Sequence, residues 1–354
     1  MSDADVQHYK GLSPYNVVHV TRPGHDYEGA ARTFRRWLDD RILVPEPRSM
    51  YVHEVAFDGR VRRDLIASLR LQDYADRVVL PHERTHRGPK EDRLALLRAT
   101  HTSLEPLWFV YEGEDTGVPA ILELVVASRG PAVSFTGPGD TRHRLWVISD
   151  PGIHSSVHEV LAKRQLLIAD GHHRYETALA FAEETGGDED APSRFTLALL
   201  TELADPGLAV LPTHRVLKAG VAVTGGEPKA SLAETLAELE GGRVAAGAYR
   251  DGEFQVLPLE GEVPVVELHE QVIDNILGKR NPEELLLYTR DPEEAVRWVD
   301  QGAGTAAFFL GPPDLGQVLK LAQEGKTLPQ KATYFHPKPP SGMVFDRLER
   351  DRRL

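Results

Sequence analysis

Apolar positions along the 354-residue chain change repeatedly between helical spacing and short strand-like runs. This alternation is typical of a mixed α/β or α+β fold, which is the fold class we expect. Helical spacing predicts helices over 28–41, 90–101, 229–239, 292–301 and 313–324. Runs rich in β-branched or aromatic residues predict strands over 50–57, 107–111, 145–149, 165–169, 195–200 and 306–310. The segment PYNVVHVTRP also predicts a strand, with Tyr15, Asn16 and Arg22 on it and a proline at its exit.

Two polar loops that contain glycine interrupt this pattern. Residues 185–192 read TGGDEDAP and are expected to form an exposed connection after a helix. Residues 219–228 read AGVAVTGGEP. We expect this second loop to separate a motif-bearing α/β region at residues 1–218 from a C-terminal α/β region at residues 219–354.

Composition and charge exclude several classes of protein. The chain has 41 Lys and Arg against 54 Asp and Glu, a net charge of −13, which argues against nucleic-acid and anionic-membrane partners. It has no cysteine, so disulfides, thiolate metal sites and a cysteine nucleophile are excluded. It shows no long apolar run, and its first residues lack a basic leader, so we expect a cytoplasmic protein.

The most informative stretch is QLLIADGHHRYETALAF, which begins at residue 165. It predicts a strand, a polar turn and a helix, with Asp170 as helix cap and Gly171 permitting a sharp turn. Three potential donors crowd the first turn of the helix: His172, His173 and Arg174. Cations at a helix N-terminus are unfavourable unless an anion is bound, so Gly171 and these donors predict a phosphate-binding elbow.

Carboxylates near these donors suggest catalytic and metal-binding roles. If a nucleotide is bound, Mg²⁺ would bridge its phosphate oxygens and be held by Asp170 or Glu176. A general base would come from Glu83 or Glu176, and His172 could exchange a proton with a phosphoryl oxygen. An alternative is a zinc site made of His172, His173 and Glu176, although the second histidine of an HExxH pattern is absent.

Three other turns carry several His, Arg or Lys residues, in PHERTHRGPKEDR, LPTHRV and TLPQKATYFHPKPPSGMVF. Each alone fits a solvated loop equally well. In a chain of negative net charge they also suggest one electropositive pocket, to which His214, Arg215 and Lys331 would contribute nucleotide contacts. No GxxxxGK[ST], GxGxxG or GxSxG motif and no protein-kinase signature is present.

Five ordered motifs resemble one protein family. They are PYNVV at 14–18, HERTHRGPKEDRLALLRAT at 82–100, ADGHHRYETAL at 169–179, LPTHRV at 211–216 and PQKATYFHPKPPSGMVF at 329–345. On these motifs the chain is identified as a member of the domain-of-unknown-function family numbered one thousand and fifteen. Members usually carry a Pro-Pro-Tyr-Asp stretch ahead of PYNVV, so we expect any pocket wall that this stretch supplies to be missing here.

A shorter resemblance concerns about fifteen residues around DGHHRYETA. This stretch is similar to the phosphate-binding motif of the ParB/sulfiredoxin-like fold, with Gly171, His173 and Arg174 at the phosphate-contacting places. The resemblance implies a nucleotide-binding core with helical and small α/β additions, as in sulfiredoxin, CTP-binding ParB proteins and kinases of free serine. Sulfiredoxin activity is excluded because the chain has no cysteine, and the negative net charge argues against ParB-type DNA binding.

These observations favour a phosphate- or nucleotide-binding enzyme. The leading hypothesis is a small-molecule kinase or phosphotransferase that uses a nucleoside di- or triphosphate, ATP or ADP, with Mg²⁺, and acts on a hydroxylated metabolite such as a free amino acid. A nucleotide-binding switch or scaffold without chemistry is one alternative. A metal-dependent hydrolase and a purely structural interaction protein are the others.

Overall fold

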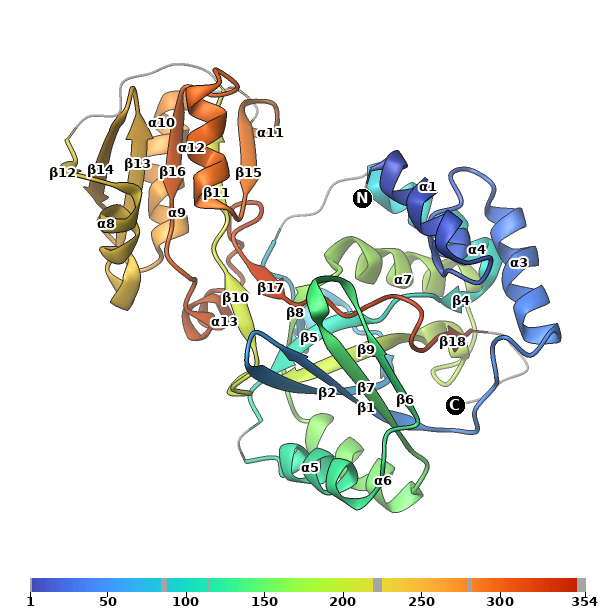
Figure 1. The fold of residues 1–354 in the computed structure, drawn as a ribbon. Helices are drawn as coiled ribbons and strands as arrows, with labels where there is room; N and C mark the ends of the chain where they lie inside the picture. The colour runs from blue at the N-terminus through green and yellow to red at the C-terminus, as the bar shows by residue number, and fades with distance from the viewer. Residues whose placement is uncertain are drawn as a thin grey trace. The chain divides into compact units, whose positions relative to one another are not determined.

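The computed structural model describes residues 2–83, 88–113, 115–218, 225–278, 280 and 282–348. Two compact units can be distinguished (Figure 1). Unit 1 comprises residues 1–80, 85–208 and 337–354, and unit 2 comprises residues 81–84 and 209–336. The expected division after residue 218 thus falls inside unit 2, and the C-terminal segment returns to unit 1.

Unit 1 is built on an eight-stranded, mostly antiparallel sheet. Its strands are β1 (Met50–Phe57), β2 (Arg60–Arg70), β3 (Val79–Leu80), β5 (Leu107–Tyr111), β6 (Val133–Thr136), β7 (Arg142–Ile148), β8 (Leu166–Asp170) and β9 (Phe195–Glu202). They lie in the order β3-β8-β5-β9-β2-β1-β7-β6. The pairs β3–β8 and β5–β9 are parallel. The strands predicted at 50–57 and 107–111 are confirmed with the same bounds.

Strand β2 was not predicted from the sequence, although its turn carries a clear signal. It pairs with β1 through Phe57↔Arg60, so the connection is the dipeptide Asp58-Gly59. Both residues have positive φ, 45° and 74°. Asp-Gly with two positive φ angles is the preferred two-residue hairpin turn. The sequence RVRRDLIASLR does not indicate a strand by its pattern. Charged side chains occupy positions that face the core, where a strand normally carries apolar residues.

Helices pack on the sheet of unit 1 and on one another. They are α1 (Asp3–Leu12), α2 (Val18–Thr21), α3 (Tyr27–Asp39), α4 (Gly88–Thr100), α5 (Val118–Ser128), α6 (Pro151–Leu161) and α7 (His172–Thr185), with short 3₁₀ turns at Tyr74–Asp76, Pro138–Asp140 and Pro192–Arg194. Helix α4 packs against both α3 and α7, whereas α5 packs against β1, β2 and β7. Apolar side chains of α5 and α6 join those of the sheet in one core cluster, and Figure 1 shows these two helices together.

One short element differs from the prediction. Residues 18–21 form helix α2 rather than a strand, so the strand prediction for PYNVVHVTRP is wrong. The amide oxygen of Asn16 accepts a hydrogen bond from the backbone N–H of Val18 at 3.1 Å. This local contact turns the chain, and it outweighs the strand preference of the valines. The predicted exposed loop at 185–192 is confirmed: α7 ends at Thr185, and the next turn begins at Pro192.

The C-terminal segment belongs to unit 1 through several contacts. Residues 346–347 form β18 (Asp346–Arg347), which pairs with β4 (Thr102–Ser103). The hydroxyl of Ser68 donates a hydrogen bond to Asp346 at 2.5 Å. Phe345 packs edge-on against Phe34 of α3, with ring centroids 5.3 Å apart. These contacts fix the chain that precedes them, residues 337–345, over unit 1.

Unit 2 has an antiparallel sheet of its own, with strand order β12-β14-β13-β16-β11-β15. The strands of unit 2 as a whole are β10 (Ala209–Leu211), β11 (His214–Leu217), β12 (Glu227–Lys229), β13 (Ala245–Arg250), β14 (Glu253–Pro258), β15 (Leu286–Thr289), β16 (Ala306–Phe309) and β17 (Tyr334–His336). Its helices are α8 (Leu232–Ala237), α9 (Pro264–Leu268), α10 (Asp274–Leu277), α11 (Pro282–Leu285), α12 (Pro292–Asp300) and α13 (Leu315–Gln323), with a 3₁₀ turn at Glu240–Gly242 and a π-helical turn at His269–Ile273. Strands β10 and β17 form a separate ribbon. Apolar side chains of α8 and α12 pack on the sheet.

The structure confirms a mixed α/β fold with multi-stranded sheets and helices. Most of the predicted loop at 219–228 lies outside the described residues. Within the described part of the chain, no helix is long and apolar enough to cross a membrane.

Candidate functional site

The predicted strand–turn–helix elbow is present at the junction of β8 and α7. Gly171 is the N-cap of α7, with φ of 107°, and no side chain caps the helix. An added Cβ at this position would lie 2.7 Å from the side chain of Leu107. Glycine is therefore required at this turn both by its backbone angle and by the space around it. The prediction that Asp170 caps α7 is wrong, because its carboxylate binds cationic side chains instead.

Asp170 lies between two cations. One of its oxygens accepts a hydrogen bond from Arg174 at 2.9 Å, and the other forms an ion pair with Lys338. Burial by itself would raise the pKa of Asp170, but the charges and hydrogen bonds of Arg174 and Lys338 hold it below its usual value. Asp170 is therefore ionised at neutral pH, and two positive charges share one negative charge.

The two histidines of the elbow differ in their surroundings. His172 is buried, and this burial, aided by the charge of His173, lowers its pKa to about 3. His172 is thus neutral at pH 7 and can exchange a proton only with a strongly acidic partner. His173 is half-buried, and its backbone carbonyl accepts a hydrogen bond from Thr177 at 2.7 Å.

Arg174 already has protein acceptors. Its guanidinium donates to the carbonyl oxygens of Glu105 at 3.2 Å and Pro106 at 2.8 Å, and to Asp170 at 2.9 Å. It therefore ties α7 to the connection between β4 and β5. A phosphate that reached this guanidinium would share it with these carbonyl groups or displace one of them.

Two further arginines, which sequence reasoning did not select as site residues, lie beside this contact. The carbonyl oxygen of Thr21 accepts hydrogen bonds from both Arg22, at 3.0 Å, and Arg93, at 3.2 Å. Burial lowers the pKa of Arg93, and the nearby charges of Arg22 and Arg174 lower it further. Like charges placed so close together are costly unless an anion compensates them.

Glu105 supplies part of that compensation. Burial would raise its pKa, but Arg174, a hydrogen bond from Ser341 at 2.6 Å and the charges of Arg22 and Arg93 lower it. Asp92, a neighbour of Arg93 at 3.9 Å, is more exposed. In this part of unit 1 the described cations Arg22, Arg93, Arg174 and Lys338 outnumber the described carboxylates Glu105, Asp170 and Asp92.

A pocket opens beside these arginines. It is small, with a cavity volume of about 70 Å³, and it is partly open to solvent. Its polar lining comprises Thr21, Arg93, Thr102, Ser103, Glu105, Arg174, Thr177 and Thr196. Its apolar lining comprises Leu96, Leu97, Leu104, Leu107 and Ala178. Of the residues that the sequence suggested for the site, Arg174 alone lines this pocket.

The carboxylates that the sequence suggested as metal ligands are both paired with lysines. Glu176 forms an ion pair with Lys90 of α4, and Asp170 forms one with Lys338. Among the described residues, no group of three or more His, Asp or Glu side chains is placed to hold a metal ion. Neither carboxylate therefore belongs to a preformed metal site.

The remaining predicted residues lie in unit 2. Arg215 is fully buried and donates to the carbonyl oxygen of Thr213 and to Nε2 of His269, the latter at 3.4 Å. Burial lowers its pKa to about 10. The Arg215 guanidinium and the Lys331 ammonium both lie over the ring of Tyr288, 5.8 and 4.5 Å from its centre.

His214 and Glu83, the other two predicted residues of unit 2, lie near Arg215. His214 is buried on β11, where burial and the charge of Arg215 lower its pKa to about 4. Glu83 forms an isolated parallel bridge with Leu328 and contributes a negative charge near Arg215. Unit 2 thus brings Arg215 and Lys331 together, whereas Asp170, Gly171, His172, His173, Arg174 and Glu176 lie in unit 1.

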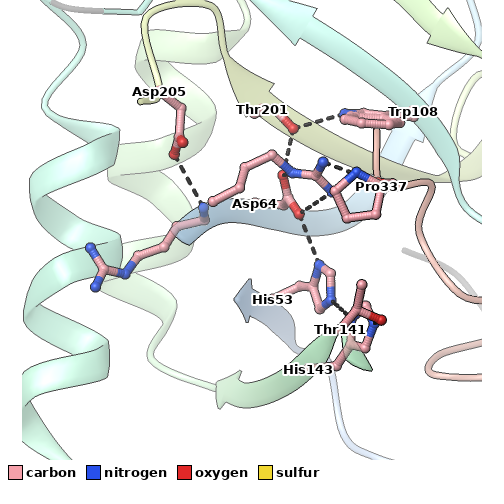
Figure 2. Close-up of polar contacts among 10 residues, drawn as sticks. His53, Asp64, Trp108, Thr141, His143, Thr201, Asp205 and Pro337 are labelled. Carbon is pink, nitrogen blue, oxygen red and sulfur yellow. Dashed lines mark hydrogen bonds and ion pairs between the residues drawn. The ribbon is translucent and has the colours of Figure 1, made fainter. Parts of the chain in front are cut away.

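A buried polar network crosses the sheet of unit 1, and sequence reasoning missed it (Figure 2). Asp64 of β2 accepts hydrogen bonds from Arg62, at 2.9 and 3.2 Å, and from Nδ1 of His53, at 2.8 Å. Nε2 of His53 contacts Nδ1 of His143 at 3.0 Å, and Nε2 of His143 contacts the hydroxyl of Thr141 at 3.0 Å. His53, Arg62 and Asp64 are fully buried. The Asp-Gly turn that precedes β2 was the signal that could have revealed the strand carrying Arg62 and Asp64.

The same network reaches β5 and the C-terminal segment. Thr201 accepts a hydrogen bond from the indole N–H of Trp108 and donates one to Asp64 at 2.5 Å (Figure 2). The guanidinium of Arg62 lies 4.2 Å from the centre of the Trp108 ring and donates to the carbonyl oxygen of Pro337 at 3.0 Å. Because Trp108 pairs with Asp170 across β5 and β8, the network lies directly behind the elbow.

Comparisons with solved structures give distant similarities. A mutant of a free serine kinase in complex with AMP has a TM-score of 0.43 and 14% identity, with 76% of this chain and 87% of that chain covered. A conserved hypothetical protein from Pyrococcus furiosus has a TM-score of 0.41 and 16% identity, with 78% and 93% covered. C-terminally truncated SbnI from Staphylococcus aureus has a TM-score of 0.40 and 13% identity, with 79% and 85% covered.

No curated protein matches the sequence. A family model does match it, over residues 1–301, which is most of the chain. The membership expected from the five ordered motifs is therefore confirmed, and the chain belongs to the family described as protein of unknown function (DUF1015).

Proposed function

We propose that unit 1 binds a phosphorylated metabolite or a nucleotide, ATP or ADP, in the pocket between α4 and α7. The observation that carries this proposal is the gathering of Arg22, Arg93 and Arg174 around one half-buried carboxylate, Glu105, in a chain of net charge −13. A phosphate group carries roughly two negative charges and several acceptor oxygens, which would neutralise this excess. The leucines on the other wall offer an apolar surface for a base or another flat group.

We propose further that the bound nucleotide donates a phosphoryl group to a small hydroxylated metabolite such as a free amino acid. Glu105 is the carboxylate that lines the pocket, and its lowered pKa keeps it ionised at neutral pH. In this scheme Glu105 accepts the proton of the substrate hydroxyl while that oxygen bonds to the transferred phosphorus, and the P–O bond to the leaving nucleotide breaks. Glu176, one of the two bases suggested by the sequence, stays the alternative.

Mg²⁺ is a common partner of nucleotides in such reactions. Asp170 and Glu176 are each engaged by a lysine, so the donor set does not fit a preformed magnesium site. We propose that any Mg²⁺ is bound by the phosphate oxygens of the nucleotide. The proposed transfer at Glu105 does not depend on a metal held by the protein.

Two narrower proposals accompany this one. We propose that the β8–α7 elbow, with a glycine of positive φ at the helix start, belongs to a ParB/sulfiredoxin-like nucleotide-binding core, and that the protein is cytoplasmic. In unit 2, Arg215 and Lys331 over one tyrosine ring, with His214 adjacent, are proposed as a second group of anion contacts.

A nucleotide-binding switch without turnover is the second candidate. Arg174 holds the carbonyl oxygens of Glu105 and Pro106, so a phosphate that competes for this guanidinium would shift the connection between β4 and β5. Binding would then change the conformation of unit 1 without any chemical step.

A transfer assay separates the two candidates. The protein is incubated with ATP or ADP, Mg²⁺ and a panel of free amino acids and other hydroxylated metabolites, and phosphorylated products are followed by ³¹P NMR. We expect transfer by the wild type, and retained nucleotide binding with transfer reduced at least about 100-fold in Glu105→Gln. Glu184→Gln is the matched control, because it makes the same change at an exposed glutamate of α7. Nucleotide binding without any product would favour the switch.

A further inference from the structure

Residues 337–341 cross the candidate site and contact both of its half-buried carboxylates. The ammonium of Lys338 forms an ion pair with Asp170, and the hydroxyl of Ser341 donates to Glu105 at 2.6 Å. Pro339 and Pro340 separate these two residues. Two consecutive prolines restrict φ and keep the backbone extended, so the spacing between the backbones of Lys338 and Ser341 is nearly rigid.

A clamp holds the beginning of this segment. One nitrogen of the Arg62 guanidinium donates a hydrogen bond to the carbonyl oxygen of Pro337 at 3.0 Å. The other two nitrogens donate hydrogen bonds to Asp64. One face of the guanidinium lies over the ring of Trp108, 4.2 Å from its centre. Because Arg62 is fully buried and contacted on several sides, the carbonyl oxygen of Pro337 is fixed relative to the sheet.

The buried ion pair of Arg62 and Asp64 is not explained by stability alone. Such a pair contributes little to stability compared with apolar side chains of similar volume. Arg62 enforces the position of Pro337, which lies 275 residues further along the chain and directly precedes Lys338. A lysine or an apolar residue at position 62 could not make the fork to Asp64 and the bond to Pro337 together.

Lys338 is suited to move between two anions. Its side chain is 46% exposed, whereas its backbone follows the clamped Pro337. Arg174 also pairs with Asp170, so Asp170 keeps a cationic partner if Lys338 turns to another anion. A compact ammonium on a flexible stem is well suited to follow a phosphate group.

We propose that Lys338 contacts the phosphate of the bound ligand and that Arg62 is the positioning residue that places it, acting through the carbonyl oxygen of Pro337. This inference rests on the proposed phosphate binding in unit 1. It adds a ligand-contacting residue from the C-terminal segment and connects the buried network to the site.

Binding of ADP and of inorganic phosphate, measured by isothermal titration calorimetry, tests the inference. Lys338→Met should weaken both affinities by about tenfold or more, and Lys338→Arg should restore most of the loss because it keeps the charge. Lys326→Met removes an exposed lysine of unit 2 and should leave the affinities unchanged. Wild-type affinity in Lys338→Met would overturn the inference.

The role of Arg62 is tested by a double-mutant cycle. Arg62→Lys should weaken ADP binding in a folded protein, and the double variant with Lys338→Met should bind no more weakly than Lys338→Met alone. Additive losses, or a lowered melting temperature with unchanged affinity, would show a merely structural role for Arg62. If Arg62→Lys does not fold, the Lys338 variants still decide whether this lysine contacts phosphate. Failure of the wild type to bind either probe would refute the proposed function itself.

Discussion

Replacing Asp64 by asparagine tests whether the buried network of unit 1 is electrostatically balanced. The fully buried carboxylate accepts two hydrogen bonds from Arg62, at 2.9 and 3.2 Å, one from His53 at 2.8 Å and one from Thr201 at 2.5 Å. Asparagine keeps the shape but removes the charge, and its NH₂ group faces hydrogen-bond donors. Arg62 would then be a buried cation without its counter-charge, which typically costs about 3–5 kcal/mol of the free energy of unfolding.

Urea denaturation followed by tryptophan fluorescence measures this loss. The fluorescence reports mainly on unit 1, which contains Trp37, Trp108 and Trp146. Asp115→Asn is the matched control: its ion pair with Arg164 at 2.8 Å is largely exposed, so a loss below about 1 kcal/mol is expected.

The double variant Arg62→Met with Asp64→Leu adds a second comparison. It removes both charges together, so it should lose less stability than Asp64→Asn alone. A loss below about 1 kcal/mol in Asp64→Asn would refute the reasoning, as would a double variant less stable than the single one.

Other predictions concern the elbow, the histidines and the pocket. Gly171→Ala should lower stability by about 1–3 kcal/mol in urea denaturation and weaken phosphate binding, because a Cβ would press on Leu107 and on the guanidinium of Arg174. Gly186→Ala, which also has positive φ but open space around it, should leave phosphate binding intact. Burial lowers the pKa of His143 to about 4, so between pH 6.5 and 4 the unfolded chain binds a proton that the folded protein does not. Stability should therefore fall as pH falls through that window, by at most about 1.4 kcal/mol per pH unit for this group, and His143→Gln should flatten the slope measured by urea denaturation at several pH values.

Sequence reasoning recovered the elements whose pattern is decided locally. Strands β1 and β5 were predicted with their observed bounds because both are rich in β-branched and aromatic residues. The elbow was predicted because a turn between a strand and a helix at Gly171 needs the positive φ that glycine adopts readily. Strand β2 was missed because Arg62 and Asp64 face inward, and such charges are acceptable only when their partners are known.

The composition of the site depends on contacts between distant segments. Arg22 follows α2, Arg93 lies on α4 and Glu105 precedes β5, so their meeting depends on the packing of these elements. Arg174 lies in the first turn of α7, where the sequence placed it, but its bonds to the carbonyl groups of residues 105 and 106 cannot be read from a local motif. The same holds for Lys338, which approaches Asp170 from the other end of the chain.

Thermal melting with phosphate-bearing ligands tests the central claim most directly, because a ligand that binds the native state raises its apparent stability. The wild type, Arg93→Met and the exposed Arg98→Met on the same helix are melted with ATP, ADP, inorganic phosphate and adenosine, each with and without Mg²⁺. We predict that ATP or ADP raises the melting temperature of the wild type and of Arg98→Met more than adenosine does, and that this difference disappears in Arg93→Met. No rise with any phosphate-bearing ligand, or an undiminished rise in Arg93→Met, would contradict phosphate binding in the pocket of unit 1.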